Sequence, residues 1–168
     1  MNNFIKALDT ALKTENWYGV LFISLTLPDI CGKVDEPKCT SSQRRTNNWF
    51  NKYLKPKYTH NLGPDGKMEH VFLSGNDFYA LRCALLHEGS GDITSQRARE
   101  VLDEFAFVMP GVRGNSRHMI QDNQTLQLQV DNFGNEMLDA LQQWLNDIKN
   151  DAVKMAKVNN FLDIKILD

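Results

Sequence analysis

The N-terminal part of the chain places apolar residues at helical spacing. Apolar side chains recur every three or four positions and predict a short amphipathic helix over residues 3–14. The residues on its apolar face are Phe4, Ile5, Leu8, Ala11 and Leu12. From Trp17 to Leu27 the chain is apolar on nearly every side, which predicts a central helix with Asn16 as its N-cap. Pro28 is expected to kink this helix or to end it near Leu27.

Cap residues bound two further helices in the middle of the chain. One helix is expected to begin at Ser41 or Ser42 and to run to about Leu54, since a proline follows two positions later. The segment NLGPDGKM then has the composition of a turn. The next helix is predicted from Ser74 to Glu88, because SGND resembles a capping box and a glycine follows the last helical position.

After this helix the chain predicts shorter elements, among them β-strands. The segment TSQRAREVLDEF is expected to add a short helix, and FAFVMP has the composition of a strand. In RHMIQDNQTLQLQV, Leu126, Leu128 and Val130 alternate with glutamines, which predicts a β-hairpin.

The C-terminal part predicts one long helix and an alternating tail. Asp131 is expected to cap a helix over residues 132–157. Its core face would carry Phe133, Met137, Leu141, Trp144, Leu145 and Ile148. The final eight residues, FLDIKILD, alternate apolar and charged positions, so they predict either a short edge strand or a tail docked on a partner.

These elements predict a mainly α protein, a helical bundle of four or five helices with a small β-hairpin appendage. A length of 168 residues, with 42% hydrophobic, is typical of one domain over residues 1–168. No apolar run reaches the length of about 20 residues that a membrane helix needs, and no signal-peptide pattern is present. Three cysteines without metal-like spacing fit reduced thiols, which indicates a cytoplasmic protein.

The net charge of −2 excludes binding of polyanions by bulk charge, so any nucleic-acid role needs a local basic patch. Such a segment lies between Glu36 and Asp65, where no acid occurs. Its bases are Lys38, Arg44, Arg45, Lys52, Lys55 and Lys57, and its aromatic residues are Trp49, Phe50, Tyr53 and Tyr58. Bases with interleaved aromatics suit single-stranded RNA, which makes Arg44, Arg45 and Lys52 candidate substrate-binding residues. The alternative, favoured for the aromatics, is a solvated helix whose aromatic rings face the core.

Arg82 and His87 interrupt an otherwise apolar or aromatic stretch, Phe78–His87. Arginine stays charged even when it is buried. Arg82 therefore needs a carboxylate partner, or it must face a cleft or a subunit boundary. Asp29 is the first choice as partner and Asp77 the second. His87 lies in the last helical turn, where the helix dipole favours its charged form. The two side chains lie about 140° apart around the helix. They are expected to converge at its end where a second copy packs against it.

The segment RCALLH, from Arg82 to His87, resembles the R-x4-6-H signature of HEPN domains. The longer stretch LSGNDFYALRCALLHEGSGDI, with DICGK and NNWFNKYL upstream, is also similar to a group of uncharacterised bacterial proteins related to that superfamily. The resemblance implies an all-helical, usually dimeric domain and metal-independent RNA cleavage, with Arg82 and His87 as catalytic residues. Family members commonly carry a polar residue directly after the arginine, where this chain has Cys83.

The resemblance therefore implies a HEPN-like metal-independent endoribonuclease, or an RNA-binding relative, with a role in stress or phage defence. Its expected partners are single-stranded RNA and a second copy of the chain, with no cofactor, metal or membrane. The alternative is a non-enzymatic helical protein-interaction module, in which Arg82 forms a structural ion pair with Asp29. A nucleotide-binding module is weaker, because the chain has no Gly-rich phosphate loop.

Overall fold

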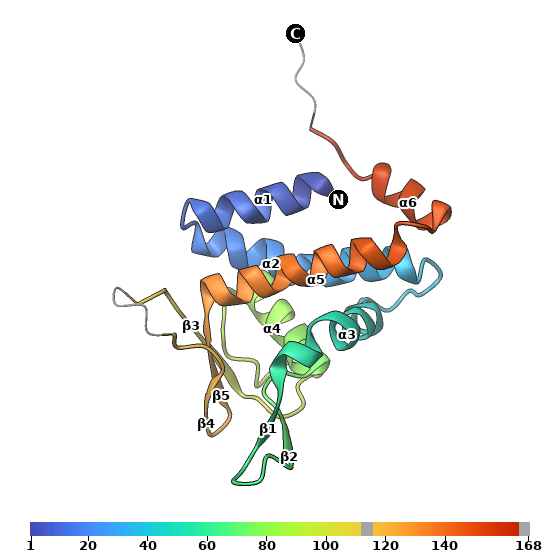
Figure 1. The fold of residues 1–168 in the computed structure, drawn as a ribbon. Coiled ribbons are helices and arrows are strands. Elements are labelled where there is room, and N and C mark those ends of the chain that lie inside the picture. Colours follow the sequence, from blue (N-terminus) through green and yellow to red (C-terminus); the bar gives the residue numbers. More distant parts are fainter. Residues whose placement is uncertain (112–115, 165–168) are drawn as a thin grey trace.

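The computed structural model describes residues 1–111 and 116–164. These residues form six helices and two small sheets and are 55% helical, so the prediction of a mainly α protein with a β part is confirmed (Figure 1). The helices are α1 (Asn2–Lys13), α2 (Trp17–Asp35), α3 (Ser42–Tyr53), α4 (Gly75–Glu88), α5 (Val130–Ile148) and α6 (Ala152–Asn159). The strands are β1 (Thr59–Leu62), β2 (Met68–Val71), β3 (Glu104–Val108), β4 (Ile120–Asp122) and β5 (Thr125–Gln129). A 3-10 turn, η1 (Lys55–Tyr58), joins α3 to β1.

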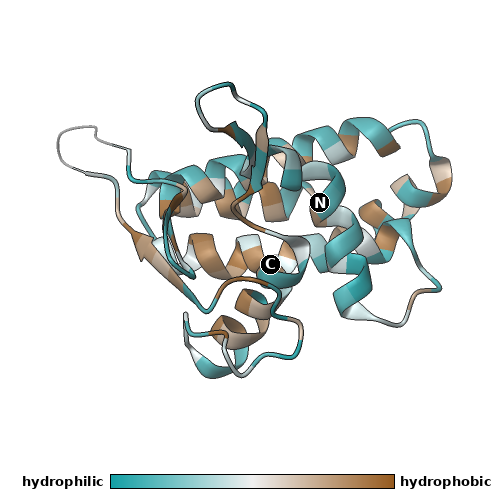
Figure 2. Cartoon of the chain, turned by 90° about the horizontal axis from the view of Figure 1, so that it is seen from below, coloured by the Kyte–Doolittle hydropathy of each residue, from teal (hydrophilic) through white to brown (hydrophobic). Residues whose placement is uncertain are grey.

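Helices α2 and α5 form the middle of the helical part. Helix α1 packs against both of them, and α3 packs against α2 and α4 (Figure 1). Most helices carry brown and teal residues on different sides in Figure 2, as expected where one face is buried. Gly134 allows α5 to approach α2, because a Cβ there would lie 2.7 Å from Val20 Cγ1. The two small sheets extend from one side of these helices (Figure 1).

Helix α2 does not end near Leu27 as predicted, but continues through Pro28 to Asp35. Proline has no backbone N–H, so the helix loses one of its internal hydrogen bonds and some stability at this position. The turns after it bury Cys31 and Val34, and this burial offsets the cost. The N-cap prediction is confirmed, since the Asn16 side chain accepts a hydrogen bond from Gly19 N.

The predicted long helix over residues 132–157 is two helices, α5 and α6. Asp131 is not the cap, because α5 begins at Val130 and Gln129 is its N-cap residue. Asp151 instead caps α6 by accepting hydrogen bonds from the backbone nitrogens of Val153 and Lys154. The predicted core face is confirmed: all its residues are buried except Leu145, which is half-buried.

The β part is larger than the predicted hairpin. Strands β4 and β5 form that hairpin, and β3, which the FAFVMP segment predicts, pairs with β5 in parallel. Strands β1 and β2 form a second hairpin whose turn uses Gly63 and Gly66 at positive φ. The short helix predicted over TSQRAREVLDEF is wrong, since the segment makes turns and leads into β3.

Local caps position α3 and α4 as predicted. Ser41 accepts a hydrogen bond from Arg44 N, and Ser74 accepts one from Asp77 N. Helix α4 ends at Gly89 with φ of +68°. At the C-terminus, residues 161–164 form no strand, and residues 165–168 of the predicted alternating tail lie outside the described residues. Within the described ranges, no helix combines the length and apolar character required to span a membrane.

Candidate functional site

Asp29, on α2, lies at the centre of a network of charged side chains. Its closest cationic partner is Arg45 of α3, whose Nε and Nη2 lie 2.9 and 2.8 Å from Asp29 Oδ1. Arg45 also donates a hydrogen bond from Nη1 to the carbonyl oxygen of Cys39 at 2.7 Å. The Arg45 side chain is only 11% exposed, and that of Asp29 is 18% exposed. Arg45 is therefore a half-buried partner of Asp29, and not a surface residue that RNA could contact freely.

Close packing of α2 and α3 fixes this pairing. A Cβ on Gly32 would lie 2.7 Å from the carbonyl oxygen of Arg45, so only glycine permits this approach. Ser42, the first residue of α3, donates a hydrogen bond to Asp29 Oδ2 at 2.7 Å. Both carboxylate oxygens of Asp29 are thus held by α3.

Arg82, on α4, reaches the same carboxylate at a longer distance. Its Nη2 lies 3.7 Å from Asp29 Oδ2, and its guanidinium carbon lies 5.7 Å from the centre of the Tyr79 ring. The buried Arg82 Nε has no hydrogen-bond partner among the described residues. The sequence-predicted contact with Asp29 is present, but Arg45 makes the closer pairing. One carboxylate thus faces two guanidinium groups, which leaves a net positive charge.

Tyr79 and Cys83 lie beside Arg82 on α4. Burial raises the pKa of the Tyr79 hydroxyl above its ordinary value of 10.0, and Cys83 nearby raises it further. A hydrogen bond with Ser42 and the charge of Arg82 act in the opposite direction. A tyrosine hydroxyl is protonated near neutral pH, so that of Tyr79 can donate a hydrogen bond to an anion.

His87 is exposed in the last turn of α4. Arg82 is 19% exposed and points toward Asp29 of α2. Among the described residues, no hydrogen bond joins the two predicted catalytic side chains. A site that uses Arg82 and His87 of the same chain requires that the side chains move, that the substrate bridges them, or that a second copy of the helix packs against this one.

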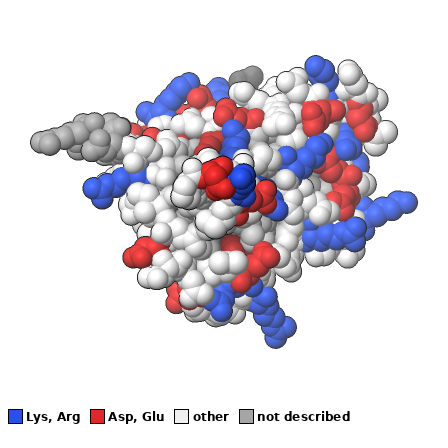
Figure 3. Space-filling view, turned by 60° about the horizontal axis from the view of Figure 1, so that its bottom comes forward, with Lys and Arg blue, Asp and Glu red and all other residues white. Residues whose placement is uncertain are grey.

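The predicted basic patch is largely compensated by acids from other parts of the chain. Arg44 is 71% exposed and lies 3.8 Å from Glu36, while Lys52 is 61% exposed and lies 2.9 Å from Asp147. Hydrogen bonds with Tyr53 and then Asp147 raise the pKa of Lys52. Figure 3 shows blue and red side chains interspersed over the face it presents. Arg44 and Lys52 remain accessible, but neither belongs to an uncompensated patch.

The aromatic residues of this segment are core residues. Trp49, Phe50, Tyr53 and Tyr58 are all buried, as the favoured alternative predicts. They therefore do not offer exposed rings on which RNA bases could stack.

Asp29 and Arg45 also line a cavity of about 420 Å³ on the surface. Lys33 and Lys157 contribute two more cations to its lining, and both donate to backbone carbonyl oxygens. Three cations thus surround one carboxylate in this cavity. This excess of positive charge favours an anion over a cation as its occupant.

Tyr58, His118 and Glu136 form a largely buried polar cluster that the sequence pattern does not predict. Glu136 accepts a hydrogen bond from the Tyr58 hydroxyl, and its other oxygen lies 3.3 Å from His118 Nε2. His118 Nδ1 accepts a hydrogen bond from Gln129 N at 3.1 Å. The three residues come from distant parts of the chain, so no local motif could reveal them. Their partners are all internal, which makes the cluster a link between η1, the β4 region and α5.

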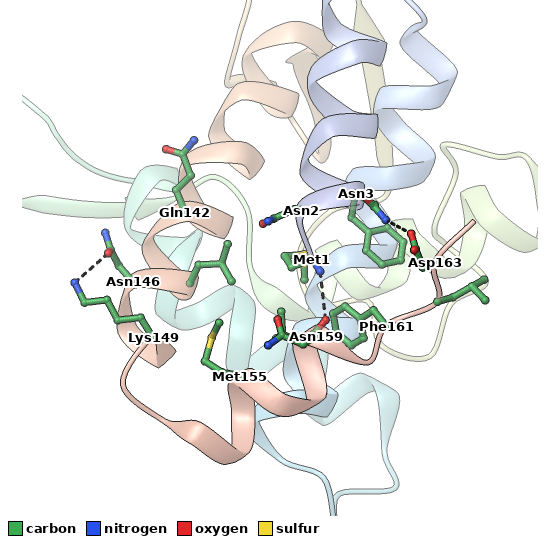
Figure 4. Close-up of a pocket in the computed structure, with 14 residues that line it drawn as sticks. Met1, Asn2, Asn3, Gln142, Asn146, Lys149, Met155, Asn159, Phe161 and Asp163 are labelled. Atoms are coloured by element: carbon green, nitrogen blue, oxygen red, sulfur yellow. Dashed lines mark hydrogen bonds between the residues drawn. The ribbon is translucent and has the colours of Figure 1, made fainter. Parts of the chain in front are cut away.

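A further cavity, of about 740 Å³, lies between the ends of α1, α5 and α6 (Figure 4). A hydrogen bond of 2.8 Å from Asn3 to Asp163 crosses its edge, and amide side chains dominate the polar part of the lining. It contains none of the predicted site residues. In the part of the chain that the structure describes, no three His, Cys, Asp or Glu side chains converge as metal ligands would.

Comparisons with known proteins found no match to a family model, a curated protein or a solved structure.

Proposed function

We propose that this protein is a HEPN-like metal-independent endoribonuclease, or an RNA-binding relative, that acts as a homodimer. The observation that carries the proposal is the uneven sharing of Asp29. Arg45 takes the close bonds to this carboxylate, so the charge of Arg82 is only partly compensated and its Nε is unpaired among described residues. A permanently charged, planar donor in this state is suited to bind a phosphodiester.

The chemistry would divide between Arg82 and His87. The RNA 2′-oxygen would attack the adjacent phosphorus as its proton passes to a base, and the bond from phosphorus to the 5′-oxygen would break. The leaving oxygen would take a proton from an acid. His87 is exposed and can serve as base or acid, a role that typically contributes about 10²–10⁴-fold to the rate. Arg82 would stabilise the charge on the phosphoryl oxygens.

A second copy of the chain would supply the second proton-transfer group. On α4, Tyr79, Cys83 and Leu86 recur at helical spacing and are only partly buried. On α2, which packs against α4, Tyr18 and Phe22 are 70% and 45% exposed. Covering these residues by a two-fold contact would bring two copies of α4 together, with Arg82 and His87 from each.

A non-enzymatic interaction module is the second candidate. The 3.7 Å contact with Asp29 and the Tyr79 ring beside the guanidinium favour a structural role for Arg82. In this case the half-exposed α4 face would bind a protein partner, and RNA would not be a substrate.

Cleavage of single-stranded RNA in the presence of EDTA tests the proposal. The wild-type chain should give products that end in 2′,3′-cyclic phosphate and should leave DNA intact, because the attacking group is the 2′-OH. His87→Ala should abolish cleavage, whereas His60→Ala, which removes another exposed histidine, should not. Arg82→Lys should also abolish it, since lysine keeps the charge but loses the planar pair of donors.

Three outcomes separate the candidates. Cleavage that depends on both residues supports the ribonuclease. Binding that weakens with salt, without cleavage, supports the RNA-binding relative. The absence of both across varied RNAs favours the interaction module and overturns the proposal.

A further inference from the structure

A polar cavity of about 310 Å³ lies at the beginning of α4, away from His87. Helix α3, the ends of β2 and β4, and residues 100–102 form its other walls. Its volume lies at the small end of the range for ligand pockets, which is about 300–1,000 Å³. It is the right order of size for a single small ring system rather than a large ligand.

A buried carboxylate holds one rim of this cavity in place. Asp77 is 1% exposed, and its Oδ1 accepts hydrogen bonds from Glu100 N at 2.7 Å and Val101 N at 3.2 Å. Its other oxygen accepts a hydrogen bond from the Ser74 hydroxyl at 3.1 Å. The bonds from Glu100 N and Val101 N hold this backbone segment beside the start of α4. This arrangement fixes the backbone at Glu100, whose exposed side chain contributes its carboxylate to the rim of the cavity.

The lining offers donors, acceptors and aromatic rings together. Lys55 supplies an ammonium group, and none of the ion pairs among the described residues includes it. Glu100 supplies a carboxylate whose nearest donor, Asn76 Nδ2, lies at a long 3.5 Å. His70 and Phe72 add two rings whose centres lie 4.4 Å apart. Asn51 adds an amide that can both donate and accept.

We propose that this cavity binds one unpaired nucleobase of single-stranded RNA, with guanine as the best match. The proposal rests on the proposed function and names its recognition site. An unpaired base is recognised through hydrogen bonds to its edge and contact of its ring with aromatic side chains. The two oxygens of Glu100 match the adjacent N1–H and N2–H donors of guanine, whereas adenine presents an acceptor at N1. Lys55 matches the phosphate attached to the same nucleotide.

Helix α4 connects this cavity to the proposed phosphate site. Asn76 and Arg82 are six residues apart, which corresponds to about 9 Å along the helix axis and about 120° around it. An extended RNA strand that passes around the helix can cover this separation. A guanine held in the cavity would then select which phosphodiester reaches Arg82.

Calorimetric titration with GMP, AMP, UMP and guanosine tests the proposal directly. GMP should bind at least about tenfold more tightly than AMP or UMP, since a bidentate contact gives discrimination of this size. Glu100→Gln should abolish the preference for GMP over AMP. Glu104→Gln removes the same charge from an exposed position on β3 and should leave the preference unchanged. Lys55→Ala should weaken GMP binding to the level of guanosine and leave guanosine binding unaltered.

The absence of binding by any of the four probes would overturn the inference, as would an unchanged preference in the folded Glu100→Gln variant. Circular dichroism shows whether each variant is folded. These outcomes do not depend on RNA cleavage. Guanine binding without cleavage would leave the nucleobase site standing and count against the ribonuclease, and cleavage without nucleotide binding would do the reverse.

Discussion

At the scale of single residues, Asp29 decides how the charges inside the protein are balanced. It accepts close bonds from Arg45 and Ser42 and a more distant interaction from Arg82. Two guanidinium groups that cannot lose their protons thus depend on one carboxylate. The same shortage of negative charge that makes Arg82 suitable for a phosphate makes the fold sensitive to Asp29.

Asp29→Asn should therefore lower the free energy of unfolding by about 3 kcal/mol, because it leaves two half-buried cations without a counter-charge. Arg45→Met should be more destabilising than Arg82→Met, since Arg45 makes the closer bonds. Urea denaturation of the three variants measures both differences. The control is Asp9→Asn, which breaks an exposed pair with Lys13 and should cost less than about 0.5 kcal/mol. Equal stability of Asp29→Asn and wild type would show that this network does not support the fold.

Because Tyr58 is buried, we expect the free energy of unfolding to depend on pH in the alkaline range. Burial raises its pKa well above the ordinary 10.0, and the Glu136 carboxylate raises it further. The folded chain thus keeps a phenolic proton that the unfolded chain releases above pH 10.0. This contribution to stability is fully present below that pH and is lost as pH rises towards the folded-state pKa. Burial also raises the pKa of Cys31 from 9.0, which acts in the same direction.

Urea denaturation across this alkaline range should show stability falling with pH, and Tyr58→Phe should make the fall less steep. Cys31 remains in that variant, so part of the slope should persist. Tyr58→Phe should also lower stability near neutral pH by about 1–3 kcal/mol, because Glu136 loses a donor. The same slope in Tyr58→Phe as in wild type would contradict this account.

At the scale of elements, sequence signals that act over a few residues predicted the structure well. The apolar spacing of α1, the Ser74 cap and Gly89 stop of α4, and the alternation in β5 all concern neighbouring positions. Such signals lower the free energy of the element itself, so they are readable without tertiary context.

Predictions failed where distant contacts decided the outcome. Helix α2 tolerates Pro28 because its later turns are buried against other elements, which no local pattern shows. At the site, the half-buried state of Arg82 and its contact with Asp29 follow from charge and apolar surroundings. The closer role of Arg45 depends on how α3 packs on α2 at Gly32, and this is a property of the assembled fold.

Helix α6 illustrates how one residue divides a long apolar pattern. Asp151 accepts two hydrogen bonds of 3.0 Å from the first turn and so starts a new helix after Ile148. Asp151→Ala should lower the free energy of unfolding by about 1 kcal/mol, whereas Asp151→Asn should retain most of it, since asparagine caps equally well. Hydrogen exchange should show the loss of protection within α6. Equal protection in the alanine variant would mean that packing, rather than the cap, defines this helix.

At the scale of the whole molecule, the apolar residues left on α2 and α4 bear on assembly. Tyr18 and Phe22 are adjacent rings, with centres 6.3 Å apart, and both are exposed. Isolated apolar residues are common on protein surfaces, whereas exposed apolar residues gathered in one patch are typical of an interaction surface. A two-fold contact here would also complete the proposed site, because it would add Arg82 and His87 of the second chain.

Light scattering at micromolar concentration should therefore give twice the chain mass of 19.3 kDa. Phe22→Glu should reduce this to the mass of one chain, because it buries a charge in the contact at a cost of several kcal/mol. Val153→Glu places the same charge on α6, at a residue that is 68% exposed, and should leave the mass of two chains unchanged. The Phe22→Glu chain should also lose RNA cleavage while keeping its helical circular dichroism. A wild-type monomer would contradict the two-fold contact, and a monomeric Phe22→Glu variant that still cleaves RNA would show that the site does not need the second copy.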